Sequence, residues 1–328
     1  MISDFDLAAL SPRLVELAGL KAFWPETPAG PPDDLSRSIA ELGLLRPLII
    51  FEESGSLRLL AGRRRRAALL SLGRSQAPAL LLPPAWPLER ALGAALADNM
   101  ERGWNEAEKA LYWAFLEGRD SDLAARLAPL LGLPPSPKMR QSCLKAASLP
   151  DDGLRALAEG RLDLENAARL ADWAPGDLAA VLPLFEILAP SKQKKREWLN
   201  WLEDLGRREK RSPAEILADP AIENILAETE KHGRPATENR LRRHLWARRH
   251  PLLARLGAER EARLRALNLP PAARLDLDPS LEDLSFKLNL SFATLEEFQS
   301  LAETLRQLGG NPDLAALMDD GQGENHDF

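Results

Sequence analysis

The sequence predicts an α+β protein: a small mixed α/β domain, then a long helical middle, then a small strand-strand-helix unit. Two short apolar runs separated by a turn, at residues 47–51 and 57–61, predict paired strands near the N-terminus. From residue 118 to about residue 268 the apolar spacing is helical throughout, and prolines punctuate the helices. Apolar and polar residues then alternate over residues 286–292, which predicts another strand.

The individual elements of the first part follow from local signals. Asp34 is expected to cap a short helix that ends at Gly43. After the two strands, Gly62 precedes a helix that stops at Gly73, and residues 79–82 read as a third strand. A further helix is expected over residues 88–99. Asn105 with Glu108 has the spacing of a capping box and predicts the start of the next helix.

Composition excludes several classes of protein. The 328 residues suit two to four small domains, and 45% hydrophobic with 28% charged residues is typical of a soluble globular protein. No apolar run reaches the length of a membrane span, and the acidic start lacks a signal-peptide pattern. The single cysteine, Cys143, excludes an internal disulfide and a cysteine-rich zinc site. We therefore expect a cytoplasmic protein without a membrane partner.

Charge is distributed unevenly along the chain. The net charge is −6, but residues 276–328 hold twelve acidic and two basic residues, so residues 1–275 carry +4. Basic stretches at 192–211 and 231–249, together with four consecutive arginines at 63–66, favour contact with a polyanion. The alternative for each stretch is a solvated helix face.

The segment 57–73 carries the most chemical information. It is predicted as a strand, then Gly62, then a helix with arginines in its first turn. Phosphate binds well at such a place, because the backbone N–H groups are unpaired, the helix dipole is positive and glycine allows close approach. Without an anion the arginines would oppose the dipole, which favours a functional interpretation over a surface cluster paired with nearby carboxylates.

Four motifs in this order resemble the N-terminal domain of ParB-family partition proteins, which shares a fold with sulfiredoxin. They span about 75 residues, and a looser similarity continues to about residue 170. The motifs are Ser38-Ile39 with residues 43–47 (SIxxxGLLQP in the family), residues 61–68 (AGxRRxxA), residues 98–102 (ENLQR) and residues 104–108 (LNPIE). Any one of these motifs would be weak evidence for the family, but the order and spacing of all four make the resemblance specific.

The resemblance implies a site for CTP and Mg²⁺. The loop at 43–47 would line the base pocket, the glycine-arginine box would hold the triphosphate, and Asp98 and Asn99 would contact the metal, which prefers such hard oxygen ligands. Arg102 would contact phosphate or brace the site. The residues implied in nucleotide binding are Gly43, Leu44, Leu45, Arg46, Pro47, Gly62, Arg63, Arg64, Arg65 and Arg102.

The chain departs from the family pattern at four positions, the first being Arg46, which stands in the place of the family's glutamine. Arg63 stands where members that hydrolyse CTP usually have glutamate, and Ala67 replaces the third arginine of their box. Asp98 is one methylene shorter than the usual glutamate. The enzyme assignment therefore stays open: weak CTP hydrolysis is one expectation, and nucleotide binding without hydrolysis is the other. Sulfiredoxin activity is not expected, because Cys143 lies far from the glycine-arginine box.

Residues 122–131 and 138–148 have the spacing of a helix-turn-helix. The second helix would enter the major groove of double-stranded DNA and offer Lys138, Arg140, Gln141, Ser142 and Lys145. The turn between the helices is about two residues longer than that of the family. Sequence-specific reading, non-specific backbone contact and a purely structural helix pair all remain open here.

Two further features have alternative interpretations. Trp198, Trp201 and Trp246 interleave with basic residues, but their helical spacing favours core packing over stacking on bases. The C-terminal strand and a helix opened by Thr294 and Glu297 suit either an intramolecular core or a homodimer interface.

The predicted organisation has five parts. They are residues 1–117, a ParB-like nucleotide-binding domain; 118–215, a helix-turn-helix DNA-binding domain; 216–270, a basic helical linker; 271–312, a ββα unit for dimerisation; and 313–328, an acidic disordered tail. The function we expect is that of a CTP–Mg²⁺-dependent DNA clamp in chromosome or plasmid partition, with a ParA-like ATPase as partner. The alternatives are a metal-dependent nuclease that uses Asp98, and a DNA-binding regulator or adaptor that has lost nucleotide turnover.

Overall fold

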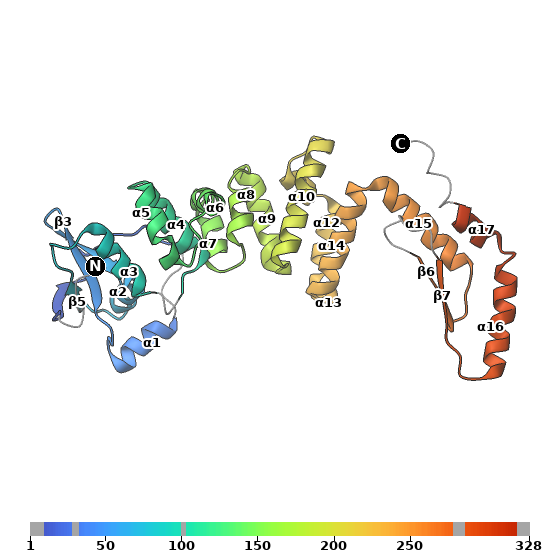
Figure 1. Cartoon of the computed structure of the whole chain (residues 1–328), viewed down its shortest axis with the longest axis horizontal. Helices are drawn as coiled ribbons and strands as arrows, with labels where there is room; N and C mark the ends of the chain where they lie inside the picture. Colours follow the sequence, from blue (N-terminus) through green and yellow to red (C-terminus); the bar gives the residue numbers. More distant parts are fainter. Residues whose placement is uncertain (1–9, 28–32, 100–102, 278–285, 320–328) are drawn as a thin grey trace. The chain divides into compact units, whose positions relative to one another are not determined.

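The computed structural model describes residues 10–27, 33–99, 103–277 and 286–319 (Figure 1). The chain divides into two compact units, Met1–Leu241 and Arg242–Phe328. The predicted α+β class is confirmed, since a small sheet is followed by a long series of helices. The finer division into five parts remains a prediction.

A five-stranded mixed sheet opens the first unit. Its spatial order is β1-β5-β3-β4-β2. Strands β3 and β4 form an antiparallel hairpin, and β3 runs parallel to β5. The predicted strands are thus confirmed, and two short edge strands join them. The bounds are β1 Arg13–Glu16, β2 Lys21–Ala22, β3 Leu48–Glu53, β4 Ser56–Ala61 and β5 Gln76–Leu81.

Two helices pack on this sheet to form the first hydrophobic core. They are α1, Asp33–Leu42, and α2, Arg63–Ser71. Leu48 of β3 and Leu59 of β4 are almost completely buried, and they cluster with Ile39 of α1 and with Leu69 of α2. Burying each such side chain stabilises the fold by about 1.5–3 kcal/mol. This core therefore holds the junction between β4 and α2 in a fixed position.

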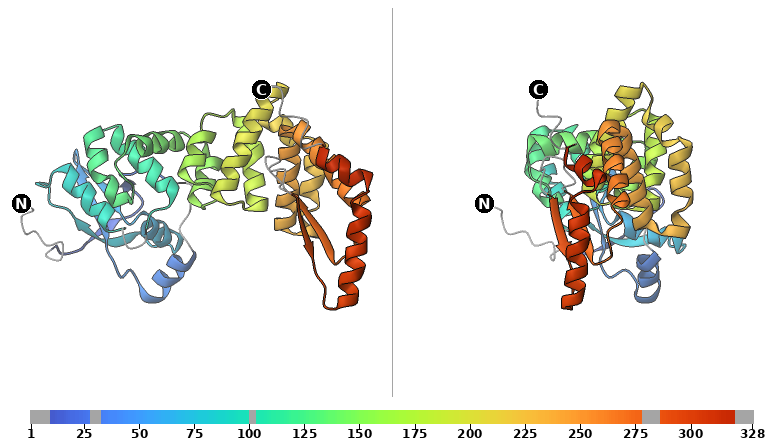
Figure 2. Two further views of the ribbon diagram at one scale, coloured as in Figure 1. Left: turned by 45° about the vertical axis from the view of Figure 1, so that its right-hand side comes forward. Right: turned by 90° about the vertical axis from the view of Figure 1, so that its right-hand side faces the viewer.

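The rest of the first unit is helical, and its helices follow one another in chain order (Figures 1 and 2). The predicted capping box is confirmed: Asn105 Oδ1 accepts from the Glu108 N–H, and the Glu108 carboxylate accepts from the Asn105 N–H. The bounds are α3 Leu88–Ala97, α4 Glu106–Glu117, α5 Ser121–Leu127, α6 Pro137–Ala147, α7 Asp151–Ala158, α8 Leu164–Leu170, α9 Pro175–Leu188, α10 Lys192–Glu209, α11 Pro213–Leu217, α12 Pro220–Ala227, α13 Thr229–His232 and α14 Arg234–Arg249.

The predicted helix at 122–131 is shorter than expected. It ends as α5 at Leu127 and continues as a 3₁₀ turn, Ala128–Leu131, because Pro129 has no N–H for an α-helical hydrogen bond. Helix α6 then begins at Pro137, and the Ser136 hydroxyl caps it by accepting from the Met139 N–H at 3.2 Å. Both helices of the predicted pair are therefore present, and the segment that connects them is longer than predicted because α5 ends at Leu127.

Most of the predicted interior residues are buried. Cys143 on α6 is fully buried, and burial raises the pKa of its thiol to about 12. Trp198 and Trp201 on α10 are core residues, as expected. Trp246 is 39% exposed, so the expectation of core packing is wrong there: the indole lies beside the His250 ring, at a centroid distance of 5.4 Å, instead of inside a core.

The second unit contains helix α15, Pro251–Ala266, and an antiparallel pair of strands, β6 Ala273–Leu277 and β7 Phe286–Leu290. The capping box of Thr294 and Glu297 is confirmed at the start of α16, Leu295–Leu308. Leu301 is buried, whereas Phe298 is 43% exposed. The last helix, α17 Pro312–Asp319, occupies the start of the tail that we expected to be disordered, and residues 320–328 lie outside the described part.

No helix within the described ranges is long and apolar enough to span a bilayer.

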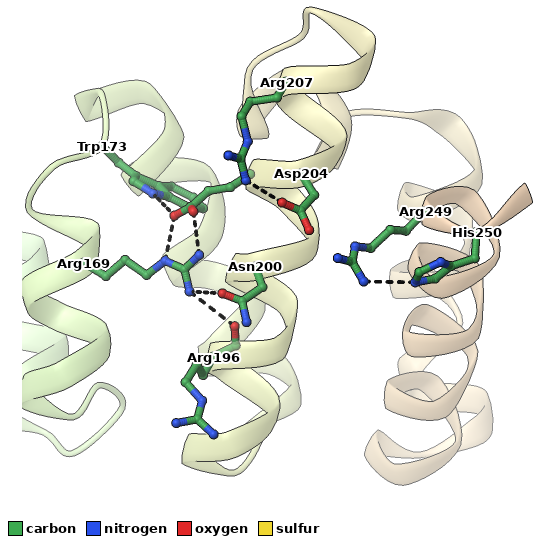
Figure 3. A network of polar contacts seen from close by, with 9 residues as sticks. Arg169, Trp173, Arg196, Asn200, Asp204, Arg207, Arg249 and His250 are labelled. Atoms are coloured by element: carbon green, nitrogen blue, oxygen red, sulfur yellow. Dashed lines mark hydrogen bonds and ion pairs between the residues drawn. The ribbon is translucent and has the colours of Figure 1, made fainter. Parts of the chain in front are cut away.

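A polar network joins helix α10 to the end of α8 (Figure 3). The Arg169 guanidinium donates to both carboxylate oxygens of Glu203, at 2.7 and 2.5 Å, and to Asn200 Oδ1 at 2.6 Å. The Trp173 indole N–H donates to the same carboxylate at 3.0 Å. Burial would raise the pKa of Glu203, but the hydrogen bonds from Arg169 and Trp173 outweigh it and lower that pKa.

We expect Glu203→Gln to destabilise the protein by about 1 kcal/mol at neutral pH, since it removes a charge-assisted pair that solvent partly screens. A carboxyl with a lowered pKa stabilises the folded state above its unfolded pKa, and this contribution is lost as pH falls through the folded pKa. Urea unfolding of both proteins at neutral pH and near pH 3 measures the effect. The difference should shrink at the lower pH, and a constant difference would contradict the proposed ionic contribution.

Candidate functional site

The start of helix α2 has the properties expected of an anion site. Gly62 precedes the helix with φ of 96°, and no side chain caps the first turn. The first turn holds arginines and no acidic residue, so positive side chains lie at the positive end of the helix dipole. This arrangement is complementary to phosphate.

Gly62 is required by both its conformation and its surroundings. Its φ lies in the left-handed region that other L-residues adopt only with strain. A Cβ at this position would lie 2.7 Å from Leu48 Cδ2, in the buried core, and 3.1 Å from Arg65 Nε. Glycine therefore allows the strand, the helix and the Arg65 side chain to meet at one point.

Arg65 joins three of the predicted motifs. Its guanidinium donates to the carbonyl oxygens of Arg46 at 3.1 Å and Pro47 at 2.7 Å. It also forms an ion pair with Asp98, with Nη2 and Oδ2 2.5 Å apart. Both side chains of this pair are largely buried, at 14% and 18% exposed. The structure thus brings the 43–47 loop, the arginine box and the Asp98 motif to one place, as the sequence predicts.

Arg63, which stands in the usual glutamate position, is held inside the protein. Its guanidinium donates to the carbonyl and the hydroxyl of Thr27. Its Nη2 also lies 3.8 Å from Oε1 of Glu108, whose side chain is only 3% exposed. Arg63 therefore lies beside a buried carboxylate of α4 and offsets its charge. Sequence reasoning identified Glu108 only as a cap and missed this pairing.

These residues surround a pocket of about 240 Å³. Its polar wall comes from the arginine box and the end of α3. Its other wall is aromatic: the Trp24 and Tyr112 rings stack 4.7 Å apart, and the Trp104 ring meets Tyr112 edge-on at 5.4 Å. The sequence analysis missed this wall. The predicted residues that line the pocket are Arg46, Gly62, Arg63, Arg64, Arg65, Asp98 and Asn99.

The 43–47 loop contributes to the pocket only in part. Arg46 lines it, whereas Leu44 packs against the hydrophobic core and the Leu45 side chain is 76% exposed. Gly43 has a positive φ and closes helix α1, and Pro47 offers its carbonyl oxygen to Arg65. The expectation that the whole loop lines a base pocket is therefore too broad.

Asp98 and Asn99 supply a limited donor set for a metal ion. The Asn99 amide N–H₂ donates to the Ala95 carbonyl at 3.1 Å, which fixes the side chain against α3. Within the described residues there is no group of three or more histidine, cysteine or acidic residues that is able to hold a metal. Two hard oxygen donors fit a Mg²⁺ ion whose coordination is completed by phosphate and water. Arg102 lies outside the described residues.

The predicted DNA-contacting residues lie around the outer part of α6, with Arg140 and Ser142, two positions apart, at its opposite edges. Lys138, Arg140 and Gln141 are exposed, and Ser142 and Lys145 are half-buried. Cys143 and Ala146 face the interior. One face of α6 is therefore polar and basic, while the opposite face packs against α4 and α8.

No family model matches the chain. It is 31% identical over 150 residues to the chromosome-partitioning protein Spo0J of Thermus thermophilus, a match that covers 44% of this chain and 52% of the relative. The chain therefore spans about half the length of this relative.

Two solved structures are also similar, both of C-terminally truncated ParB from Caulobacter crescentus. The complex with the centromeric parS site is 19% identical, covers 57% of this chain and 97% of that chain, and has a TM-score of 0.30. The complex with CTP-gamma-S is 23% identical, covers 53% and 98%, and has a TM-score of 0.24. Superpositions this weak say nothing of how this chain binds a ligand. Over this 150-residue stretch, the chain is therefore similar in sequence to a chromosome-partitioning protein.

Proposed function

We propose that this chain is a DNA-binding partition protein that binds CTP with Mg²⁺ and closes on double-stranded DNA as a clamp. The observation that carries the proposal is the convergence of Arg65, Asp98 and the Arg46 loop around the uncapped start of α2. A strand, a glycine and a helix N-terminus provide backbone N–H donors for phosphate, and the arginines add charge.

Each wall of the pocket has a role in this proposal. Gly62, Arg64 and Arg65 would hold the triphosphate, and Asp98 and Asn99 would hold Mg²⁺ through their side-chain oxygens. The aromatic wall would provide a flat apolar surface for the base or ribose. The metal would supply positive charge that offsets the repulsion between the Asp98 carboxylate and the phosphates.

Helix α6 is the proposed DNA-contacting element. Its exposed face presents Lys138, Arg140, Gln141, Ser142 and Lys145, side-chain types suited to phosphates and base edges. The partly exposed apolar residues of the second unit, including Phe292, Leu295 and Phe298, suit a homodimer interface. A ParA-like ATPase as partner, a cytoplasmic location on the nucleoid and slow CTP hydrolysis belong to the same proposal.

Isothermal titration of the full chain with CTP, ATP, GTP and UTP tests the nucleotide site. Each titration is run with Mg²⁺, with and without duplex DNA. We expect binding that is selective for CTP and that weakens when the metal is removed. Absence of binding by all four nucleotides would reject the site.

One observation favours a second candidate, a DNA-binding regulator that has lost nucleotide turnover. Arg63 and Arg65 both have carboxylate partners within the protein, Glu108 and Asp98. In this case the arginine box is a structural cluster. The regulator predicts DNA binding that is unchanged by any nucleotide, so the same titrations distinguish the two candidates.

A further inference from the structure

Basic side chains on the exposed face of α6 contact carboxylates from neighbouring helices. Arg140 Nη2 lies 2.5 Å from Oε1 of Glu117, the last residue of α4. Lys145 forms an ion pair with Asp172, just beyond the end of α8. Lys138 lies farther from its neighbour, with 3.7 Å between its Nζ and Oε1 of Glu165.

The Arg140 pair is the best defined of these contacts. The Arg140 side chain is 53% exposed, but that of Glu117 is only 12% exposed, so the carboxylate is fixed and the guanidinium reaches out to it. Both Nε and Nη2 donate to Oε1 of Glu117. Glu117 also lies at the negative end of the α4 dipole, which adds to the attraction for a cation.

The two acidic residues belong to different neighbours of α6. Helix α6 packs against α4 and against α8 (Figure 1). Glu117 ends α4 and pairs with Arg140, whereas Asp172 follows α8 and pairs with Lys145. A DNA phosphate that approaches Arg140 or Lys145 must replace a carboxylate that is already present, and it is repelled by that carboxylate as well. A base edge that accepts two hydrogen bonds at once compensates for the exchange better than a single phosphate oxygen.

We propose that Glu117 and Asp172 are specificity-determining residues that limit indiscriminate DNA binding by α6. They hold Arg140 and Lys145 in pairs that an arbitrary phosphate backbone exchanges only at a cost. The proposal rests on the proposed function, because it requires that α6 faces DNA. It assigns a role to two acidic side chains that the site on α2 does not use.

The experiment compares the wild-type chain with E117Q/D172N, which keeps the shape of both side chains. Binding to a short duplex of random sequence is followed by fluorescence anisotropy between about 50 and 200 mM NaCl. We expect the variant to bind about tenfold more tightly at the lowest salt, since each exposed pair opposes binding several-fold. The slope of the logarithm of the binding constant against the logarithm of the salt concentration should become steeper by about one to two units.

The matched control is E259Q/E303Q, which removes two carboxylates paired with Arg255 and Arg306 in the second unit. It makes the same change in net charge, and we expect less than about twofold change in affinity, because neither carboxylate is paired with a residue of α6. If both variants bind DNA more tightly by the same factor, Glu117 and Asp172 have no specific role. The change in net charge then explains the effect.

A third variant, R140A/K145A, separates failure of this inference from failure of the proposed function. If R140A/K145A weakens duplex binding while E117Q/D172N leaves it unchanged, α6 contacts DNA but the carboxylates do not limit it. If R140A/K145A leaves binding unchanged, α6 does not face DNA, and both proposals for this helix are overturned. Thermal unfolding of each variant confirms that the chain remains folded.

Discussion

Replacing Arg65 by glutamate is expected to weaken CTP binding by about 100-fold or more. The substitution removes a charge-assisted donor to phosphate, worth about 3 kcal/mol, and places a negative charge at the start of α2. It also sets a carboxylate against Asp98 and releases the carbonyl oxygens of Arg46 and Pro47. Isothermal titration with CTP and Mg²⁺ measures the loss.

Two further variants make this result interpretable. Arg74→Glu makes the same charge reversal at an exposed position just after α2, and we expect it to bind CTP normally. Arg65→Lys keeps the charge but loses the planar fork that serves two carbonyls and one carboxylate together, so intermediate binding is expected. If the Arg65→Glu variant is folded and binds CTP with wild-type affinity, Arg65 is not part of the nucleotide site.

Replacing Gly62 by alanine is expected to lower the free energy of unfolding by about 2–5 kcal/mol. The left-handed backbone costs an L-residue about 1–2 kcal/mol, and the close approach to buried Leu48 adds the cost of overpacking, about 1–3 kcal/mol. The new methyl group also crowds Arg65, so we expect this variant to lose nucleotide binding as well as stability. Urea unfolding and CTP titration measure the two effects.

Gly93→Ala provides the matched control for this substitution. Gly93 lies within α3, and a Cβ there would meet Leu127 and Leu130 at an ordinary 3.9 Å. Alanine favours a helix over glycine by up to about 1 kcal/mol, so this variant should be as stable as the wild type or slightly more stable. If both alanine variants were equally stable, the strain that we assign to Gly62 would be wrong.

The sequence predicted the elements that have strong local signals. The strand–glycine–helix segment around Gly62 and the capping boxes at Asn105 and Thr294 depend on residues a few positions apart, and all three are present. The short strands β1 and β2 were missed because four and two residues are too few to show an alternating pattern. They form only by pairing with β5 and β4.

The candidate site was predictable in its motifs but not in its partners. Arg65 and Asp98 are 33 positions apart, and Trp24 and Tyr112 are farther apart still, so their contacts depend on tertiary packing. The pairing of Arg63 with Glu108 is similar, since a capping residue gives no signal of a second role. For Trp246 the sequence predicted a buried residue, but the side chain is exposed. Helical spacing alone does not indicate whether another part of the protein covers that face of the helix.

The buried Cys143 has a consequence for the chemistry of the whole chain. It is the sole cysteine, it lies on the inner face of α6, and its thiol stays protonated at any physiological pH because its pKa is about 12. Reagents that act on exposed thiolates therefore find no cysteine target in the folded protein. The cysteine of the helix proposed to contact DNA is thus protected from thiol oxidation and alkylation. A cysteine introduced on its outer face would be the first thiol that a maleimide label meets.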